Sequence, residues 1–233
     1  MTRRAFTLLE ILIVVVILGG LIVVVFAVFA VGVSGFKLGT VRLDLQSELR
    51  RIINPLRQDL RNSSFQSTSF VSVNRNVPAN PPDAQPVTPV HRDGLCFNGL
   101  KHVLDDASYD QSGFPKWDCY VVYFASLDEP DGKMVRLTLR DDDVPPDDVL
   151  SIPRTLAAGD LSLTNPELLD GNVRILSNQV MDFEVSTDQG NQLVHLRLRL
   201  RGKAGHQDMG RRSIAEVLEI NTAVRPANTW PRL

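Results

Sequence analysis

The chain has few of the residues from which disulfide scaffolds, metal centres and nucleic-acid surfaces are built. Its 233 residues include only two cysteines and four histidines, and 6% are aromatic. Two cysteines are too few for a disulfide-dense scaffold or a four-cysteine zinc site. Lysine and arginine number 25 against 27 aspartate and glutamate. We therefore expect no nucleic-acid partner, because the basic surface of a dedicated nucleic-acid binder is missing.

Sequence signatures of common enzymes are also missing. No two of the histidines (His91, His102, His195 and His206) are four positions apart, and no H-E-x-x-H, G-x-S-x-G, P-loop or G-x-G-x-x-G motif occurs. Five carboxylates crowd residues 141–148, and calcium prefers oxygen ligands, but the spacing is not that of an EF-hand. A solvated acidic loop is the simpler interpretation, with calcium as the alternative. We expect no enzyme, no resident metal and no other cofactor.

What the sequence does contain is a long uncharged segment near its start. The 26 residues from Ile11 to Phe36 carry no charge. As a helix they would measure roughly 39 Å, more than the ~30 Å hydrocarbon core of a bilayer. Secretory signals have a shorter apolar core of about 7–15 residues. The segment therefore predicts a membrane-spanning helix, and a signal peptide cleaved after Ala30 is the alternative.

The charged residues before this segment predict its orientation. Arg3 and Arg4 precede it, and Glu10 stands at its entrance. By the positive-inside rule the two arginines stay in the cytoplasm and the chain after the helix faces outward. A carboxylate inside a bilayer costs a few kcal/mol, so Glu10 needs either a partner cation or a position at headgroup depth.

The segment from Arg3 to Leu12, RRAFTLLEIL, resembles the class III signal of type IV pilins and type II secretion pseudopilins. The resemblance implies that a prepilin peptidase removes residues 1–5 by cutting between Ala5 and Phe6, and that the new Phe6 amine is N-methylated. Glu10 is then the fifth mature residue, where the family has a glutamate that pairs with the amine of a neighbouring subunit. The family usually has glycine before the cut, so Ala5 is a departure.

A second helical pattern follows the apolar run. Apolar residues recur every three or four positions, at Leu38, Val41, Leu45, Leu49, Ile52, Leu56 and Leu60. This half of the helix is predicted to pack on a soluble domain, and Pro55 to kink or interrupt it. The domain organisation we expect is a leader (1–5), a transmembrane and assembly helix (6–36), an amphipathic helix (37–61) and a β-rich extracytoplasmic domain (62–233).

Strand patterns dominate the last of these segments. Residues 62–95 are predicted to be an irregular loop with one β-like piece at 69–73. Later β-branched and alternating runs predict two hairpins and a closing strand, at 120–124 with 134–140, 180–186 with 193–201, and 215–224. Only one face of that sheet is expected to need a cover, which the amphipathic helix supplies. The predicted fold class is α+β, a long N-terminal helix packed on an antiparallel β-sheet, which is also the pilin arrangement.

Two further features remain open. Cys96 and Cys119 enclose 22 residues, and in an oxidising compartment they are expected to form a disulfide that contributes about 3 kcal/mol, with two unpaired thiols as the alternative. Arg197, Arg199 and Arg201 alternate with apolar residues. This basic row either faces carboxylates on neighbouring strands or binds an acidic partner or phosphate.

The sequence thus predicts a structural filament subunit. The tail from Val180 to Pro226 resembles W-type minor pilins and J-type pseudopilins in pattern and size. The resemblance implies a bacterial inner-membrane protein with a cytoplasmic N-terminus that enters a type IV pilus or type II secretion pseudopilus. Its partners would be the prepilin peptidase, other pilins or pseudopilins, and the inner membrane. The alternative is a single-pass, membrane-anchored extracytoplasmic binding module.

Overall fold

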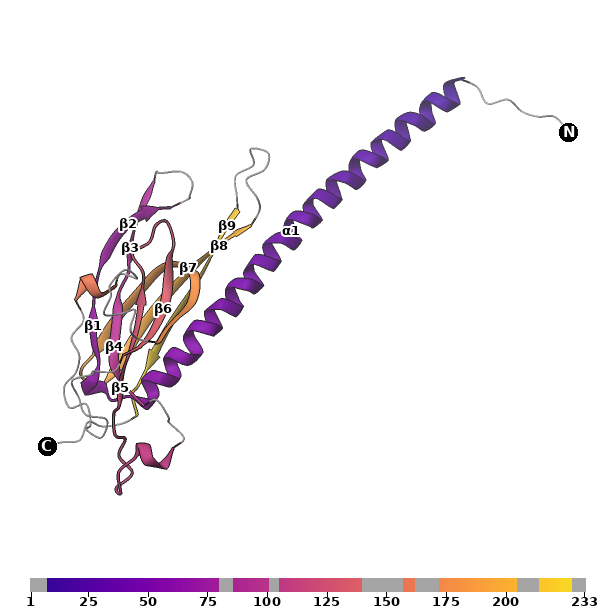
Figure 1. Ribbon diagram of the computed structural model, residues 1–233. Coiled ribbons are helices and arrows are strands. Elements are labelled where there is room, and N and C mark those ends of the chain that lie inside the picture. Colours follow the sequence, from indigo (N-terminus) through magenta and orange to yellow (C-terminus); the bar gives the residue numbers. More distant parts are fainter. Residues whose placement is uncertain are drawn as a thin grey trace.

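The computed structural model describes residues 8–79, 86–100, 105–139, 157–161, 172–204 and 214–227. In these ranges the chain forms one long helix and two antiparallel sheets (Figure 1). Several residues singled out above lie outside the described ranges: Arg3, Arg4, Ala5, Phe6, His102, 141–148 and His206.

The helix α1 (Leu8–Asn62) has 55 residues and is therefore about 82 Å long. Every residue from Leu8 to Lys37 is exposed, and this part of α1 extends beyond the sheet (Figure 1). The second half is buried along one stripe, which consists of Leu45, Leu49, Ile52, Ile53, Leu56 and Leu60. The amphipathic pattern predicted from the sequence is confirmed.

Pro55 does not interrupt α1, so this part of the prediction is wrong. The helix continues for seven residues beyond it, to Asn62. Proline removes the hydrogen bond to the carbonyl four residues earlier and disfavours a helix interior. Leu56 and Leu60, both fully buried, hold the last two turns against the sheet. Tertiary packing there outweighs the local preference of one residue.

The main sheet has seven strands in the order β1-β4-β5-β6-β7-β8-β9, and every neighbouring pair is antiparallel. Its strands are β1 (Ser69–Val71), β4 (Gly94–Gly99), β5 (Cys119–Ala125), β6 (Gly132–Leu139), β7 (Asn172–Asp188), β8 (Leu193–Ala204) and β9 (Ile214–Val224). The predicted hairpins are the pairs β5–β6 and β7–β8, and the closing strand is β9. All three predictions are confirmed.

The region predicted to be an irregular loop contains strands, so this prediction is wrong. A separate two-stranded ribbon pairs β2 (Asn74–Pro78) with β3 (Val87–His91), and β4 begins at Gly94. Val77 and Val90 on the ribbon bury themselves with Met181 on β7. A proline closes β2 and another lies within β3, which a two-stranded ribbon tolerates because each strand has an unpaired edge.

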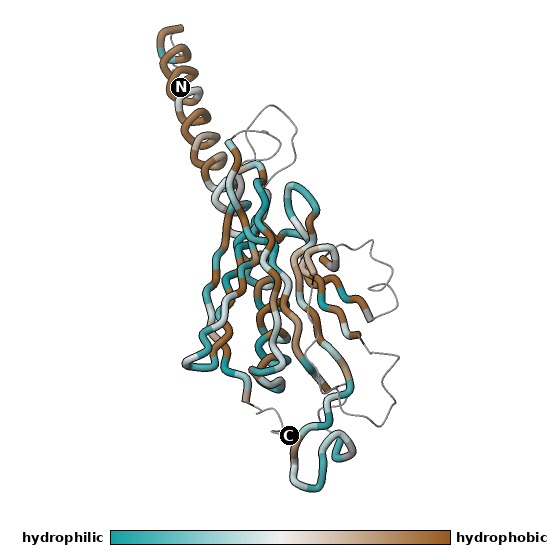
Figure 2. Tube along the Cα trace, turned by 90° about the vertical axis from the view of Figure 1, so that its left-hand side faces the viewer, coloured by the Kyte–Doolittle hydropathy of each residue, from teal (hydrophilic) through white to brown (hydrophobic). Residues whose placement is uncertain are grey.

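The main sheet has an apolar cluster on each face, so the expectation that only one face needs a cover is wrong at β4, β5 and β6, whereas the outer face of β7, β8 and β9 is open. One apolar cluster lies between α1 and the sheet and includes Phe97, Tyr123 and Phe183. A second cluster on the opposite face gathers Trp117 and Leu161 around strands β4, β5 and β6. These two clusters lie inside the domain, whereas the apolar start of α1 extends beyond it and has no protein cover. Figure 2, coloured by hydropathy, shows this contrast.

Candidate functional site

The first half of α1 is an apolar surface with no protein around it. Between Leu8 and Phe36 the large apolar side chains are all exposed, from 37% for Val33 to 85% for Leu8. There are 21 of them, and at about 1.5 kcal/mol for full burial of an exposed side chain, covering the part that is still exposed would contribute on the order of 20 kcal/mol in all. Water is therefore an unsuitable solvent for this segment, which is long and apolar enough to cross a membrane.

Glu10 is the one charged residue between Leu8 and Phe36. It lies in the first described turn of α1 and is exposed. Its neighbours three and four positions along the helix are Ile13 and Val14, so no polar stripe continues from it. The predicted pairing with the Phe6 amine of another subunit stays a prediction, because Phe6 lies outside the described residues.

A polar clamp (Asp59, Tyr123 and Arg136) fixes the second half of α1 on the sheet. The Asp59 carboxylate on α1 accepts a hydrogen bond from the Tyr123 hydroxyl on β5 at 2.7 Å. It also accepts one from Nε of Arg136 on β6 at 2.8 Å. Burial, together with the negative Asp59, raises the pKa of Tyr123 above its usual range. The phenol therefore stays a donor at neutral pH and holds α1 at one rotation.

Two more contacts fix α1 further towards its exposed half. The Ser177 hydroxyl on β7 donates to the Glu48 carboxylate at 2.5 Å. Gly202 on β8 lies under the helix, and a Cβ there would meet Val41 at 2.7 Å and Leu45 at 3.0 Å. The helix thus approaches β8 more closely than any larger residue would allow. Its rotation sets the direction in which Glu10 points relative to the domain.

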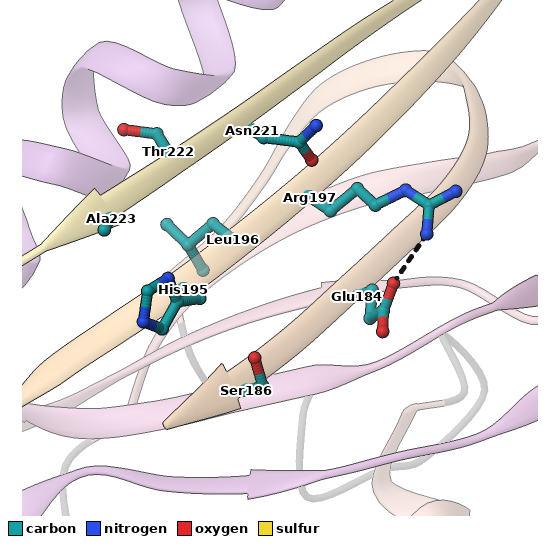
Figure 3. Close-up of a pocket in the computed structure, with 8 residues that line it drawn as sticks. All are labelled: Glu184, Ser186, His195, Leu196, Arg197, Asn221, Thr222 and Ala223. Carbon is teal, nitrogen blue, oxygen red and sulfur yellow. Dashed lines mark hydrogen bonds and ion pairs between the residues drawn. The ribbon is translucent and has the colours of Figure 1, made fainter. Parts of the chain in front are cut away.

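The opposite face of β7, β8 and β9 carries a charged strand face (Asp182, Glu184, Arg197, Arg199 and Glu219). Arg197 lies 3.0 Å from Glu184 and 3.2 Å from Glu219, as the dashed contact in Figure 3 shows for Glu184. Arg199 lies 2.9 Å from Asp182. Slight desolvation opposes protonation of Arg197, but its acidic neighbours raise its pKa overall. The interpretation that the basic row faces carboxylates of neighbouring strands is confirmed for these two arginines.

A shallow hollow of about 460 Å³ lies on the same face, and His195 and Ser186 line it beside Arg197 (Figure 3). His195 is exposed, and no hydrogen bond joins it to Ser186 in the described part of the chain. Within the described residues no three His, Cys, Asp or Glu side chains are placed to hold a metal ion. The hollow therefore offers a polar surface but no assembled catalytic group.

A buried polar network, missed in the sequence analysis, ties the β2–β3 ribbon to the sheet. Arg92 is fully buried and donates hydrogen bonds to the carbonyls of Val180 and Pro130. Burial lowers its pKa to about 10, although Asp131 and Asp182 act in the opposite direction. The only signal in the sequence was the charged pair Arg92-Asp93 inside a supposed loop.

Arg201, the third member of the basic row, belongs to this network. Its side chain is inaccessible and lies 2.5 Å from Asp131. It also donates to the carbonyls of Pro78 and Ala79, at 2.9 Å and 2.8 Å. The buried charge is thus compensated by partners within the domain and is closed to an external ligand.

The two cysteines do not form the predicted disulfide. Both are buried thiols on adjacent strands, with Cys96 opposite Val122 and Cys119 opposite Gly99. They are thus three positions apart along the strands, roughly 10 Å, whereas a disulfide needs Cα atoms within about 7 Å. They also point to opposite faces, because Cys96 belongs to the outer cluster and Cys119 to the cluster under α1. The prediction is wrong, and the alternative of two thiols holds.

Comparison with known proteins gives no relative for this chain. No family model, no curated protein and no solved structure matches it. Among the chain's own features, the exposed apolar half of α1 and its single acid are the most distinctive.

Proposed function

We propose that this chain is a pilin-like structural subunit, a minor pilin or pseudopilin. In this proposal prepilin peptidase removes residues 1–5, the Phe6 amine is methylated, and the subunit enters or primes a type IV pilus or type II secretion pseudopilus. Before assembly it crosses the bacterial inner membrane once, with its N-terminus in the cytoplasm and its domain outside.

The observation that carries the proposal is the exposed apolar half of α1 with Glu10 at its start. Such a surface needs either lipid or other apolar helices around it, and a filament subunit uses both in turn. A carboxylate in that setting is stabilised by a partner cation. An ammonium at ~4 Å would attract it by about 4 kcal/mol at an effective dielectric constant near 20. The RRAFTLLEIL segment places Phe6 four residues before Glu10, so each subunit would supply both charges.

A membrane-anchored binding module is the second candidate, favoured by the hollow and the charged strand face beside it. The two candidates differ in what they require of Glu10. An anchor needs only the apolar length of α1, which Glu10→Ala increases. A filament subunit needs the carboxylate itself.

The experiment compares Glu10→Ala and Glu10→Asp with the wild-type chain at equal membrane levels. We expect Glu10→Ala to insert, be processed and fold, but to enter sheared filaments or partner-subunit complexes at least tenfold less. Glu10→Asp should be intermediate, because the carboxylate remains with a shorter reach. Intact mass of each variant reports whether the mature chain begins at Phe6.

Asp44→Ala is the matched control, since Asp44 is an exposed acid on the soluble part of the same helix. It should enter filaments as the wild type does. Incorporation of Glu10→Ala at the wild-type level would reject the charge-pair mechanism and leave the anchored binding module. A chain that still begins at Met1 would reject the processing step.

A further inference from the structure

The outer edge of β9 is unusually open for an edge strand. Among the described strands β9 pairs only with β8, in unbroken register over eleven residues from Ile214 to Val224. It contains no proline, lysine or arginine and no bulge, and its two acids, Glu216 and Glu219, are paired with Arg42 and Arg197 of the same chain, so the usual protections of an edge are few. The opposite edge, β1, is only three residues long. β9 therefore presents the longest row of main-chain groups available for pairing with another strand.

Contacts at its two ends show that β9 runs along α1 in the same chain direction. Near its start Glu216 lies 3.9 Å from Arg42. Just past its end the Ala227 amide donates to the Arg61 carbonyl at 2.9 Å. The two elements lie side by side in Figure 1. The direction of β9 is thus tied to the direction in which α1 points.

This direction limits how a second copy of the chain could supply the pairing strand, given the membrane anchoring under Proposed function, on which this step rests. Antiparallel pairing of β9 with β9 of another copy would turn the two α1 helices in opposite directions, and one bilayer cannot hold both. Pairing with β1 of another copy would be parallel, because six antiparallel steps separate β1 from β9. A parallel pair limited to three residues is weak. Parallel pairing of β9 with β9 of another copy would keep both α1 helices aligned but would place them on opposite faces of the joined sheet, and parallel pairs are less stable per residue. We therefore take a strand of a different polypeptide as the occupant, and a second copy is an outcome of the test.

An arginine flank (Arg50, Arg57 and Arg61) indicates the chemistry of that polypeptide. These side chains follow one another at intervals of seven and four residues, so they share one side of α1. All three are exposed, and no carboxylate in the described residues lies within ion-pair distance of them. Arg57 and Arg61 line a hollow of about 450 Å³ that Ala227 closes where the chain leaves β9. The flank is complementary to an acidic segment.

We propose that the outer edge of β9 and the arginine flank together bind an extended acidic segment of a different polypeptide. Main-chain hydrogen bonds to β9 supply the pairing. Carboxylates on the bound strand meet Arg57 and Arg61, which select acidic over basic sequences. The site is independent of Glu10, which lies forty or more residues away at the far end of α1.

The test uses the full chain in detergent micelles and three fluorescein-labelled octapeptides. The first alternates glutamate and valine, the second alternates lysine and valine, and the third is the first with every amide N-methylated. We expect the Glu-Val peptide to bind at least tenfold more tightly than either of the others by fluorescence anisotropy. The double variant Arg57→Glu/Arg61→Glu should weaken its binding at least tenfold.

Arg75→Glu is the matched control, because Arg75 is an exposed arginine on β2, away from β9. It should bind the Glu-Val peptide as the wild type does. Equal binding of the N-methylated peptide would overturn strand addition, and equal binding of the Lys-Val peptide would overturn the charge selection. Light scattering compares the wild-type chain with Arg57→Glu/Arg61→Glu. A dimer of the wild type that is lost in the double variant would mean that the strand comes from a second copy of the chain. Because every arm retains Glu10, failure here is separable from failure of the filament proposal.

Discussion

Asp59→Ala should destabilise the domain by removing the centre of the polar clamp. In the wild type this carboxylate accepts hydrogen bonds from Tyr123 at 2.7 Å and from Arg136 at 2.8 Å. Hydrogen bonds to a charged group contribute about 1.5–3 kcal/mol each. The Asp59 and Arg136 side chains are 22% and 26% exposed, so solvent screening places both bonds at the lower end of that range. Together the loss is about 3 kcal/mol.

Thermal unfolding of the full chain in detergent micelles, followed by near-ultraviolet circular dichroism, measures this loss. For a domain of this size 1 kcal/mol corresponds to about 2–4 °C, so the Tm should fall by roughly 6–12 °C. Asp44→Ala is the control, since this acid is exposed on the same helix and should change the stability by no more than about 0.5 kcal/mol.

The partner variant tests whether the clamp acts as a unit. Tyr123→Phe alone should cost about 1.5 kcal/mol, because it removes one hydrogen bond to the carboxylate. In the Asp59→Ala background, Tyr123→Phe should cost less than it does in the wild type. The difference, which is the coupling free energy of the two residues, should be about 1 kcal/mol. Full additivity, or an Asp59→Ala effect no larger than that of Asp44→Ala, would refute the reasoning that the clamp fixes α1 on the sheet.

Three other predictions follow from the packing. Cys96 and Cys119 should both react with a maleimide in denaturant without reductant and resist it in the native protein; mass mapping of a linked pair would contradict this. Gly202→Ala should cost about 1–3 kcal/mol, since its Cβ would lie 2.7 Å from Val41, whereas Gly159→Ala, with open space around it, should be neutral by the same thermal assay. Because the pKa of Tyr123 is raised in the folded state, its contribution is complete below its unfolded value of about 10 and is lost as pH rises above it. Urea unfolding from pH 9 to 11 should therefore show that the unfolding free energy falls with pH, and falls less steeply in Tyr123→Phe. An equal slope in the variant would show that Tyr123 does not cause the fall.

The sequence by itself determined the elements whose pattern is local. The uncharged run from Ile11 to Phe36 and the apolar stripe from Val41 to Leu60 each repeat within a few residues, and both are parts of α1 as expected. The alternation along β8 likewise gave its two faces correctly, because successive side chains of a strand point in opposite directions. Glu10 was found in the same way, as one acid in an apolar run.

Tertiary structure alone decided the features that join distant parts of the chain. The clamp joins residues 64 and 77 positions apart, and Asp93 in the supposed loop accepts a hydrogen bond from the Val185 amide, 92 positions away. Local composition there favoured a loop, but pairing and burial with distant partners produced strands. The cysteines show the same limit, since a spacing of 22 residues says nothing about the register and face of two paired strands. Which face a residue occupies depends on its partners in space, and these are set by the packing of the whole domain.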